Sequence, residues 1–74
     1  MTDVDRKRPS FADYHPSDVV SRKDAALLLG VSGRTLADWA TDGKGPLFVA
    51  LGRRVVYQVS DLLAYLSDRK RQTA

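Results

Sequence analysis

Two short helical patterns, separated by a very short break, constrain the fold of this chain more than any other feature. Ser21 precedes the first pattern, Gly30 ends it, and Ser32 precedes the second. A serine hydroxyl can accept a free backbone N–H of the first helical turn, and glycine adopts the left-handed conformation that closes a helix. Because the connection covers only residues 30–32, the sequence predicts two helices that cross steeply.

Apolar residues recur at helical spacing in both patterns. They are Ala25, Leu28 and Leu29 in the first helix and Leu36, Trp39 and Ala40 in the second. Gly43 or Gly45 is expected to end the second helix. Each helix therefore has one apolar face available for a shared core.

A β-hairpin and a third helix are expected next. Residues 47–51 form a strand by composition, and residues 54–57 form its partner. Gly52 and Arg53 between them fit a two-residue type II′ turn, with glycine at the first central position. Ser60 is the expected cap of the third helix. The expected buried positions of that helix are Leu62, Leu63, Tyr65 and Leu66.

The order helix, helix, hairpin, helix describes a winged helix-turn-helix, a mainly α fold with three helices and one two-stranded wing. We expect this domain to span residues 18–68, after a flexible N-terminal tail (1–17) and before a basic, frayed C-terminal end (69–74). The tail is interrupted by proline and lacks a helical or strand period. Phe11 and Tyr14 leave one alternative open, in which part of the tail docks on the domain.

Composition argues against most other classes of protein. The 74 residues make a single small domain with no deep enzyme pocket, so no enzymatic activity, cofactor or small-molecule ligand is expected. The chain has no cysteine, and His15 is its one histidine, which leaves no ligand set for a metal. No uninterrupted apolar run is longer than Ala25 to Leu29, so no membrane association is expected, and a cytoplasmic location is the default.

Positive charge is concentrated in the middle of the chain. The formal net charge is +3, and residues 21–57 hold six of the twelve basic residues but only three of the nine acidic ones. A basic surplus on the predicted helix pair and hairpin favours a polyanionic partner, and double-stranded DNA is the partner that a helix-turn-helix suits.

A set of motifs carries a resemblance to a known family. These motifs are Ser21-Arg22-Lys23-Asp24-Ala25-Ala26, Leu29-Gly30-Val31-Ser32, Arg34-Thr35-Leu36 with Trp39, Gly43-Lys44 with Pro46, Gly52-Arg53-Arg54 with Tyr57, and Ser60-Asp61-Leu62 with Tyr65-Leu66. Through them the chain resembles the excisionase and AlpA-type regulators, small MerR-like winged-helix DNA-binding proteins of phages, prophages and plasmids. The resemblance covers about residues 19–67.

The resemblance implies that the second helix enters the major groove and that the wing reaches a neighbouring minor groove or the phosphate backbone. The implied DNA-binding residues are Arg34, Thr35, Asp38 and Thr41 in the major groove, Arg53 and Arg54 in the wing, and Arg22, Lys23 and Lys44 at the backbone. Members of the family often carry several arginines along the reading helix. This chain has Ala37, Asp38, Ala40 and Asp42 there, which places more weight on Arg34 and on the wing.

Each of these residues also has a simpler interpretation. Arg34 can bind guanine or a phosphate, or it can be a solvated arginine. Thr35 can contact DNA or only support the start of the helix, and Asp38 can accept from cytosine N4 or form a surface ion pair. Arg53 and Arg54 can enter a narrow minor groove or merely keep an edge strand soluble.

The residues expected at the DNA backbone and the aromatic residues have simpler interpretations too. Arg22 and Lys23 can contact phosphate or can be a solvated first turn. Lys44 can contact phosphate or only complete the turn. Trp39, Tyr57 and Tyr65 are assigned to packing in the core.

The resemblance suggests a phage excisionase, a recombination directionality factor that bends DNA, with an integrase as partner and cooperative self-association on repeated sites. A small phage or plasmid transcriptional regulator of the same fold is the alternative. A basic protein-interaction module without DNA binding is a third hypothesis, from another class.

Overall fold

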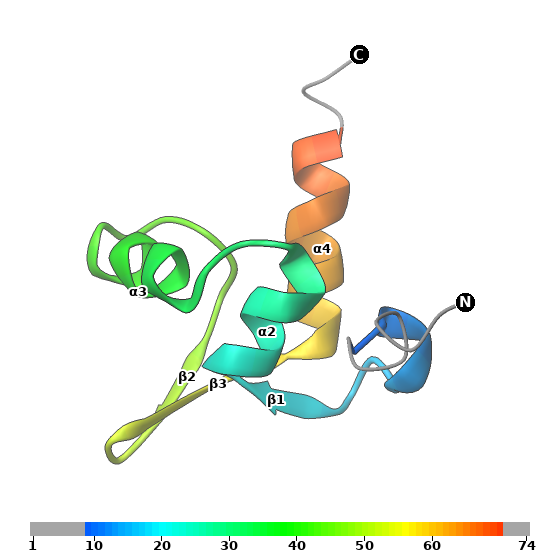
Figure 1. Cartoon of the computed structure of the whole chain (residues 1–74), viewed down its shortest axis with the longest axis horizontal. Coiled ribbons are helices and arrows are strands. Elements are labelled where there is room, and N and C mark those ends of the chain that lie inside the picture. Colours follow the sequence, from blue (N-terminus) through cyan, green and yellow to red (C-terminus); the bar gives the residue numbers. More distant parts are fainter. Residues whose placement is uncertain (1–8, 71–74) are drawn as a thin grey trace.

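The computed structural model describes residues 9–70. Its elements are the 3₁₀ turn η1 (Phe11–Asp13), β1 (Val19–Ser21), α2 (Arg22–Leu29), α3 (Gly33–Thr41), β2 (Val49–Leu51), β3 (Arg54–Gln58) and α4 (Val59–Lys70). Three helices and an antiparallel hairpin confirm the winged helix-turn-helix (Figure 1). The expected tail residues 1–8 and C-terminal residues 71–74 lie outside the described residues.

Both helices of the central pair begin and end by local rules. Ser21 Oγ accepts the Asp24 N–H at 3.2 Å, so the expected cap of α2 is confirmed. Gly30 then ends α2 in the left-handed conformation, with φ 76°. Ser32 Oγ caps α3 in the same way. Gly43, with φ 73°, follows the end of α3, which confirms the first of the two expected stop positions.

The sheet has three strands in the order β1-β3-β2, one more than the sequence indicated. Val20 in β1 pairs with Tyr57 in β3, and both are buried on the face that carries the core. A strand of three residues is too short to show a period of two, which is why only its pairing with β3 identifies β1. The wing is therefore joined to the helical body by a further strand rather than standing alone.

The core lies between the sheet, α2, α3 and the first turns of α4. Its buried members are Val20, Ala25, Ala26, Leu36, Tyr57, Val59 and Leu62. The prediction that Leu63 and Leu66 are buried is wrong, since they are 39% and 36% exposed. The buried residues of α4 are Val59 and Leu62, and Tyr65 packs on Trp39, whereas the far end of the helix extends past the rest of the domain in Figure 1.

Ser60 does not cap α4, which starts one residue earlier at Val59. The first N–H groups of the helix are satisfied by carbonyls from the segment before β1. Val59 N–H donates to Asp18 O and Ser60 N–H donates to Pro16 O, both at 2.9 Å. A tertiary contact thus replaces the local cap that the sequence suggested.

Residues 9–17 differ from the expected flexible tail. Ser10 and Asp13 form a reciprocal capping box around η1. Phe11 and Tyr14 are half-buried and pack against the core, so for these residues the structure shows the docked alternative. At the other end, α4 continues through Lys70 and includes the start of the expected frayed end.

Candidate nucleic-acid interface

The start of α3 is held by a pair of hydroxyl groups. Ser32 Oγ accepts the Thr35 N–H at 3.0 Å and donates to Thr35 Oγ1 at 2.9 Å. Thr35 is half-buried, and its hydroxyl supports the first turn of the helix by accepting this bond from Ser32. This bond is the simpler of the two roles foreseen for Thr35, and a DNA contact by this residue stays a prediction.

Three of the predicted major-groove residues form one exposed row along α3. Arg34, Asp38 and Thr41 lie at positions i, i+4 and i+7, opposite the buried Leu36. The Arg34 side chain is 90% exposed, and its Nε lies 4.0 Å from Asp38 Oδ2. An exposed ion pair of this kind contributes less than about 1 kcal/mol, so Arg34 can exchange it for a DNA contact. The Thr41 hydroxyl donates to Ala37 O at 3.1 Å and keeps its oxygen free to accept.

The wing carries its arginines at an exposed tip. Leu51 pairs with Arg54, which leaves Gly52 and Arg53 as a two-residue turn. Gly52 has φ 62° and Arg53 does not have a positive φ, which fits a type II′ turn and excludes type I′. Both arginines are exposed. The base of the wing is anchored by the Phe48 and Tyr57 rings, whose centroids lie 6.0 Å apart.

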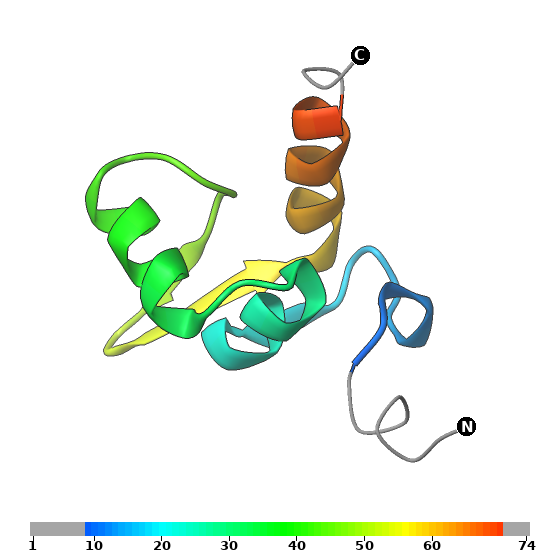
Figure 2. The same cartoon turned by 45° about the horizontal axis from the view of Figure 1, so that its top comes forward.

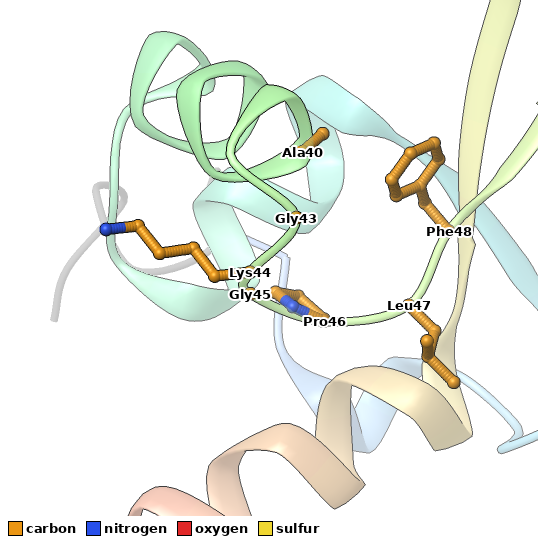
Figure 3. Close-up of a pocket in the computed structure, with 7 residues that line it drawn as sticks. All are labelled: Ala40, Gly43, Lys44, Gly45, Pro46, Leu47 and Phe48. Atoms are coloured by element: carbon orange, nitrogen blue, oxygen red, sulfur yellow. The ribbon is translucent and has the colours of Figure 1, made fainter.

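The connection between α3 and the wing folds tightly against Trp39. Lys44 N–H donates to Trp39 O at 2.8 Å, and Gly45 lies against the indole ring. The ring of Trp39 also lies 5.8 Å from the ring of Tyr65 in α4, measured between centroids. Trp39 thus packs as expected and ties the reading helix to both the connection and α4. In Figure 3 the Lys44 side chain points away from the pocket that Ala40 and Phe48 line, and Lys44 is an exposed residue.

Arg22 and Lys23, the two residues of α2 expected to contact the DNA backbone, differ in their surroundings. Lys23 is exposed, whereas Arg22 is half-buried. Arg22 Nε–H donates to the hydroxyl of Tyr57 in β3 at 3.5 Å. The sequence assigned Tyr57 to packing alone and gave no signal for this bond, because 35 positions separate the two residues.

The folded chain brings α3 and the wing tip to one side of the molecule. In both Figure 1 and Figure 2 they lie on the left, whereas α4 and η1 lie further to the right. The exposed row of α3 and the arginines of the wing therefore belong to elements on a common side. Within residues 9–70, no helix is long and apolar enough to cross a bilayer. No cluster of three histidine or acidic side chains in that same range could hold a metal ion.

Comparison with known proteins agrees with this geometry. A family model described as a helix-turn-helix domain matches residues 19–70, which is most of the chain. The match spans α2, α3, the wing and α4, and it fits the resemblance to the small excisionase and AlpA-type proteins. The comparisons with curated proteins and with solved structures gave no significant match. The chain therefore belongs to the helix-turn-helix domain family, and this domain indicates DNA as its partner.

Proposed function

We propose that this protein is a phage excisionase, a recombination directionality factor that biases an integrase toward excision. The observation that supports DNA docking is the position of α3 and the wing tip on a common side, each with exposed arginine, and the choice of an excisionase rests on the family resemblance. An α-helix fits the major groove of B-DNA, and a hairpin tip can follow the backbone into the next minor groove. Two such elements on one side can engage neighbouring grooves of the same duplex.

In this proposal Arg34 reads guanine or holds a phosphate from the major groove. Asp38 either accepts from cytosine N4 or releases Arg34 when DNA arrives. Arg53 and Arg54 enter a narrow minor groove, whose negative potential attracts arginine without a base-specific bond. Engagement of both grooves favours bent DNA, since the added contacts offset a deformation cost of roughly a few kcal/mol.

The protein acts by binding alone in this scheme, and the integrase carries out strand exchange. Repeated sites near an attachment site would place several copies side by side on the duplex. We infer that these copies cooperate and that the assembled, bent DNA is what the integrase recognises. Neither a catalytic residue nor a cofactor of this chain takes part.

A salt titration on labelled duplex DNA tests the groove-docking model. The five candidate cations at the backbone and the wing are Arg22, Lys23, Lys44, Arg53 and Arg54. If each neutralises one phosphate, log affinity should fall against log salt with a slope of about −4 to −5. A nearly flat slope would contradict the model.

Single-charge variants locate the contact. Arg34→Ala should cost roughly 1–3 kcal/mol of binding and relax sequence preference if this residue reads a base. Arg54→Ala should lower the salt slope by about one. The matched control is Lys70→Ala, which removes a positive charge from the far end of α4 and should leave affinity nearly unchanged. Equal losses in all three variants would mean that net charge, rather than this side of the molecule, sets affinity.

Footprinting on the source genome separates the proposed role from its alternatives. Protection of repeated sites beside an attachment site supports the excisionase. Protection of a promoter without such repeats supports a small transcriptional regulator of the same fold. Absence of duplex binding near 0.1 M salt, together with partner binding that survives Arg54→Ala, supports the protein-interaction module.

A further inference from the structure

One buried tyrosine has its hydroxyl next to a candidate DNA-contacting arginine. Tyr57 lies in β3 and is 1% exposed, with its ring against Phe48. Its hydroxyl accepts the Nε–H of Arg22 at 3.5 Å. Packing alone needs no hydroxyl at this position, because a phenylalanine ring fills almost the same space. The polar atom of Tyr57 therefore calls for a role of its own.

The bond to Tyr57 engages only a small part of the arginine. A guanidinium has five N–H donors, so Nε bound to Tyr57 leaves four on the two terminal nitrogens. Arg22 is also half-buried at the first position of α2, whereas the Arg34 side chain is 90% exposed. A freely rotating arginine loses much rotamer freedom when it binds a phosphate, and one that is already held loses less.

The position of the pair in the fold fits this interpretation. Arg22 begins the first helix of the helix-turn-helix, which crosses the DNA backbone in this motif. Tyr57 belongs to the strand that carries Arg54 at the wing tip. The bond thus connects the start of α2 to the strand of the wing, and it fixes the position of the Arg22 guanidinium relative to the wing.

We propose that Tyr57 is a positioning residue for DNA binding, which holds the Arg22 guanidinium ready for a backbone phosphate. The proposal rests on the DNA-docking geometry described above and adds a residue that does not itself touch DNA. It predicts that the Tyr57 hydroxyl affects affinity only while Arg22 is present.

The test is a double-mutant cycle with Tyr57→Phe and Arg22→Ala. Dissociation constants are measured by fluorescence anisotropy on a labelled mixed-sequence duplex at several salt concentrations. Tyr57→Phe should weaken binding about three- to tenfold in the wild-type background, which is the range for loss of one hydrogen bond. The same change should have no effect in the Arg22→Ala background. Arg22→Ala itself should lower the salt slope by about 0.9.

Two further variants separate positioning from stability. Tyr65→Phe removes the hydroxyl of a second tyrosine, which is half-buried and packs on Trp39, and should leave affinity unchanged. Arg22→Lys keeps the charge but lacks the Nε donor, so it should weaken binding about as much as Tyr57→Phe. It tests the same bond if Tyr57→Phe fails to fold in a thermal melt.

Three outcomes would overturn the proposal. Tyr57→Phe could leave affinity unchanged, it could weaken binding equally with and without Arg22, or Arg22→Lys could bind as tightly as the wild type. In each of these cases wild-type binding and its salt slope persist, so the DNA-binding function stands. If the wild-type protein fails to bind duplex DNA at all, the proposed function and this inference both fail.

Discussion

Gly45→Ala should destabilise the domain strongly, because this glycine is confined in two ways. Its φ is +84°, and a Cβ at this position would lie 2.9 Å from Trp39 Cε3 and 3.0 Å from Trp39 Cβ. Alanine in the left-handed conformation costs about 1–2 kcal/mol, and overpacking against a ring costs about 1–3 kcal/mol more. Since a chain of this size has only about 4–11 kcal/mol of total stability, the variant should lose a large share of it.

Urea unfolding followed by circular dichroism and by the fluorescence of Trp39, the one tryptophan, measures the loss. Gly43→Ala is the matched control. Gly43 has φ +73°, but nothing lies within 4 Å of its Cβ position, so this variant should lose only the conformational part, about 1–2 kcal/mol. Equal losses in the two variants would refute the conclusion that Gly45 packs on Trp39. A larger loss in Gly45→Ala would support the contact that holds α3 beside the wing.

Two other substitutions test the cap and the core. Ser32→Ala removes the acceptor of the first turn of α3 and should lower the free energy of unfolding by about 1 kcal/mol in the same urea titration. An unchanged midpoint would contradict the cap. Leu62→Ala should cost about 2–5 kcal/mol because this side chain is fully buried, whereas the 39% exposed Leu63 should cost less than about 1 kcal/mol on the same change. Thermal melts that reverse this order would mean that α4 faces the core differently.

The features of the candidate interface fall into two groups. One group depends on interactions between residues close in the sequence, and the other depends on contacts that form only in the folded domain. The exposed row of α3 and the arginines of the wing tip follow from helical spacing and from turn chemistry, and both are visible in the sequence. The bond between Arg22 and Tyr57, and the packing of Gly45 on Trp39, join residues whose relation appears only after the strands pair and the connection folds back. Sequence patterns and residue propensities describe neighbours along the chain. They therefore predict the exposed row of α3 and the wing tip, but they do not predict the two contacts.

The sequence by itself determined the elements whose hydrogen bonds close within a few residues. Ser21 and Ser32 cap their helices, Gly30 and Gly43 end them, and Gly52 makes the hairpin turn. These outcomes depend on the conformational range of glycine and on the reach of a serine hydroxyl, which are properties of the residues themselves.

Only the tertiary structure decided how these elements are joined. The strand β1, the start of α4 on the carbonyls of Pro16 and Asp18, and the docking of Phe11 and Tyr14 all depend on partners far along the chain. An N–H group can donate to any carbonyl that comes close, and an aromatic ring can pack against any apolar surface. Which partner comes close is set by the packing of the whole domain, and no local pattern records it.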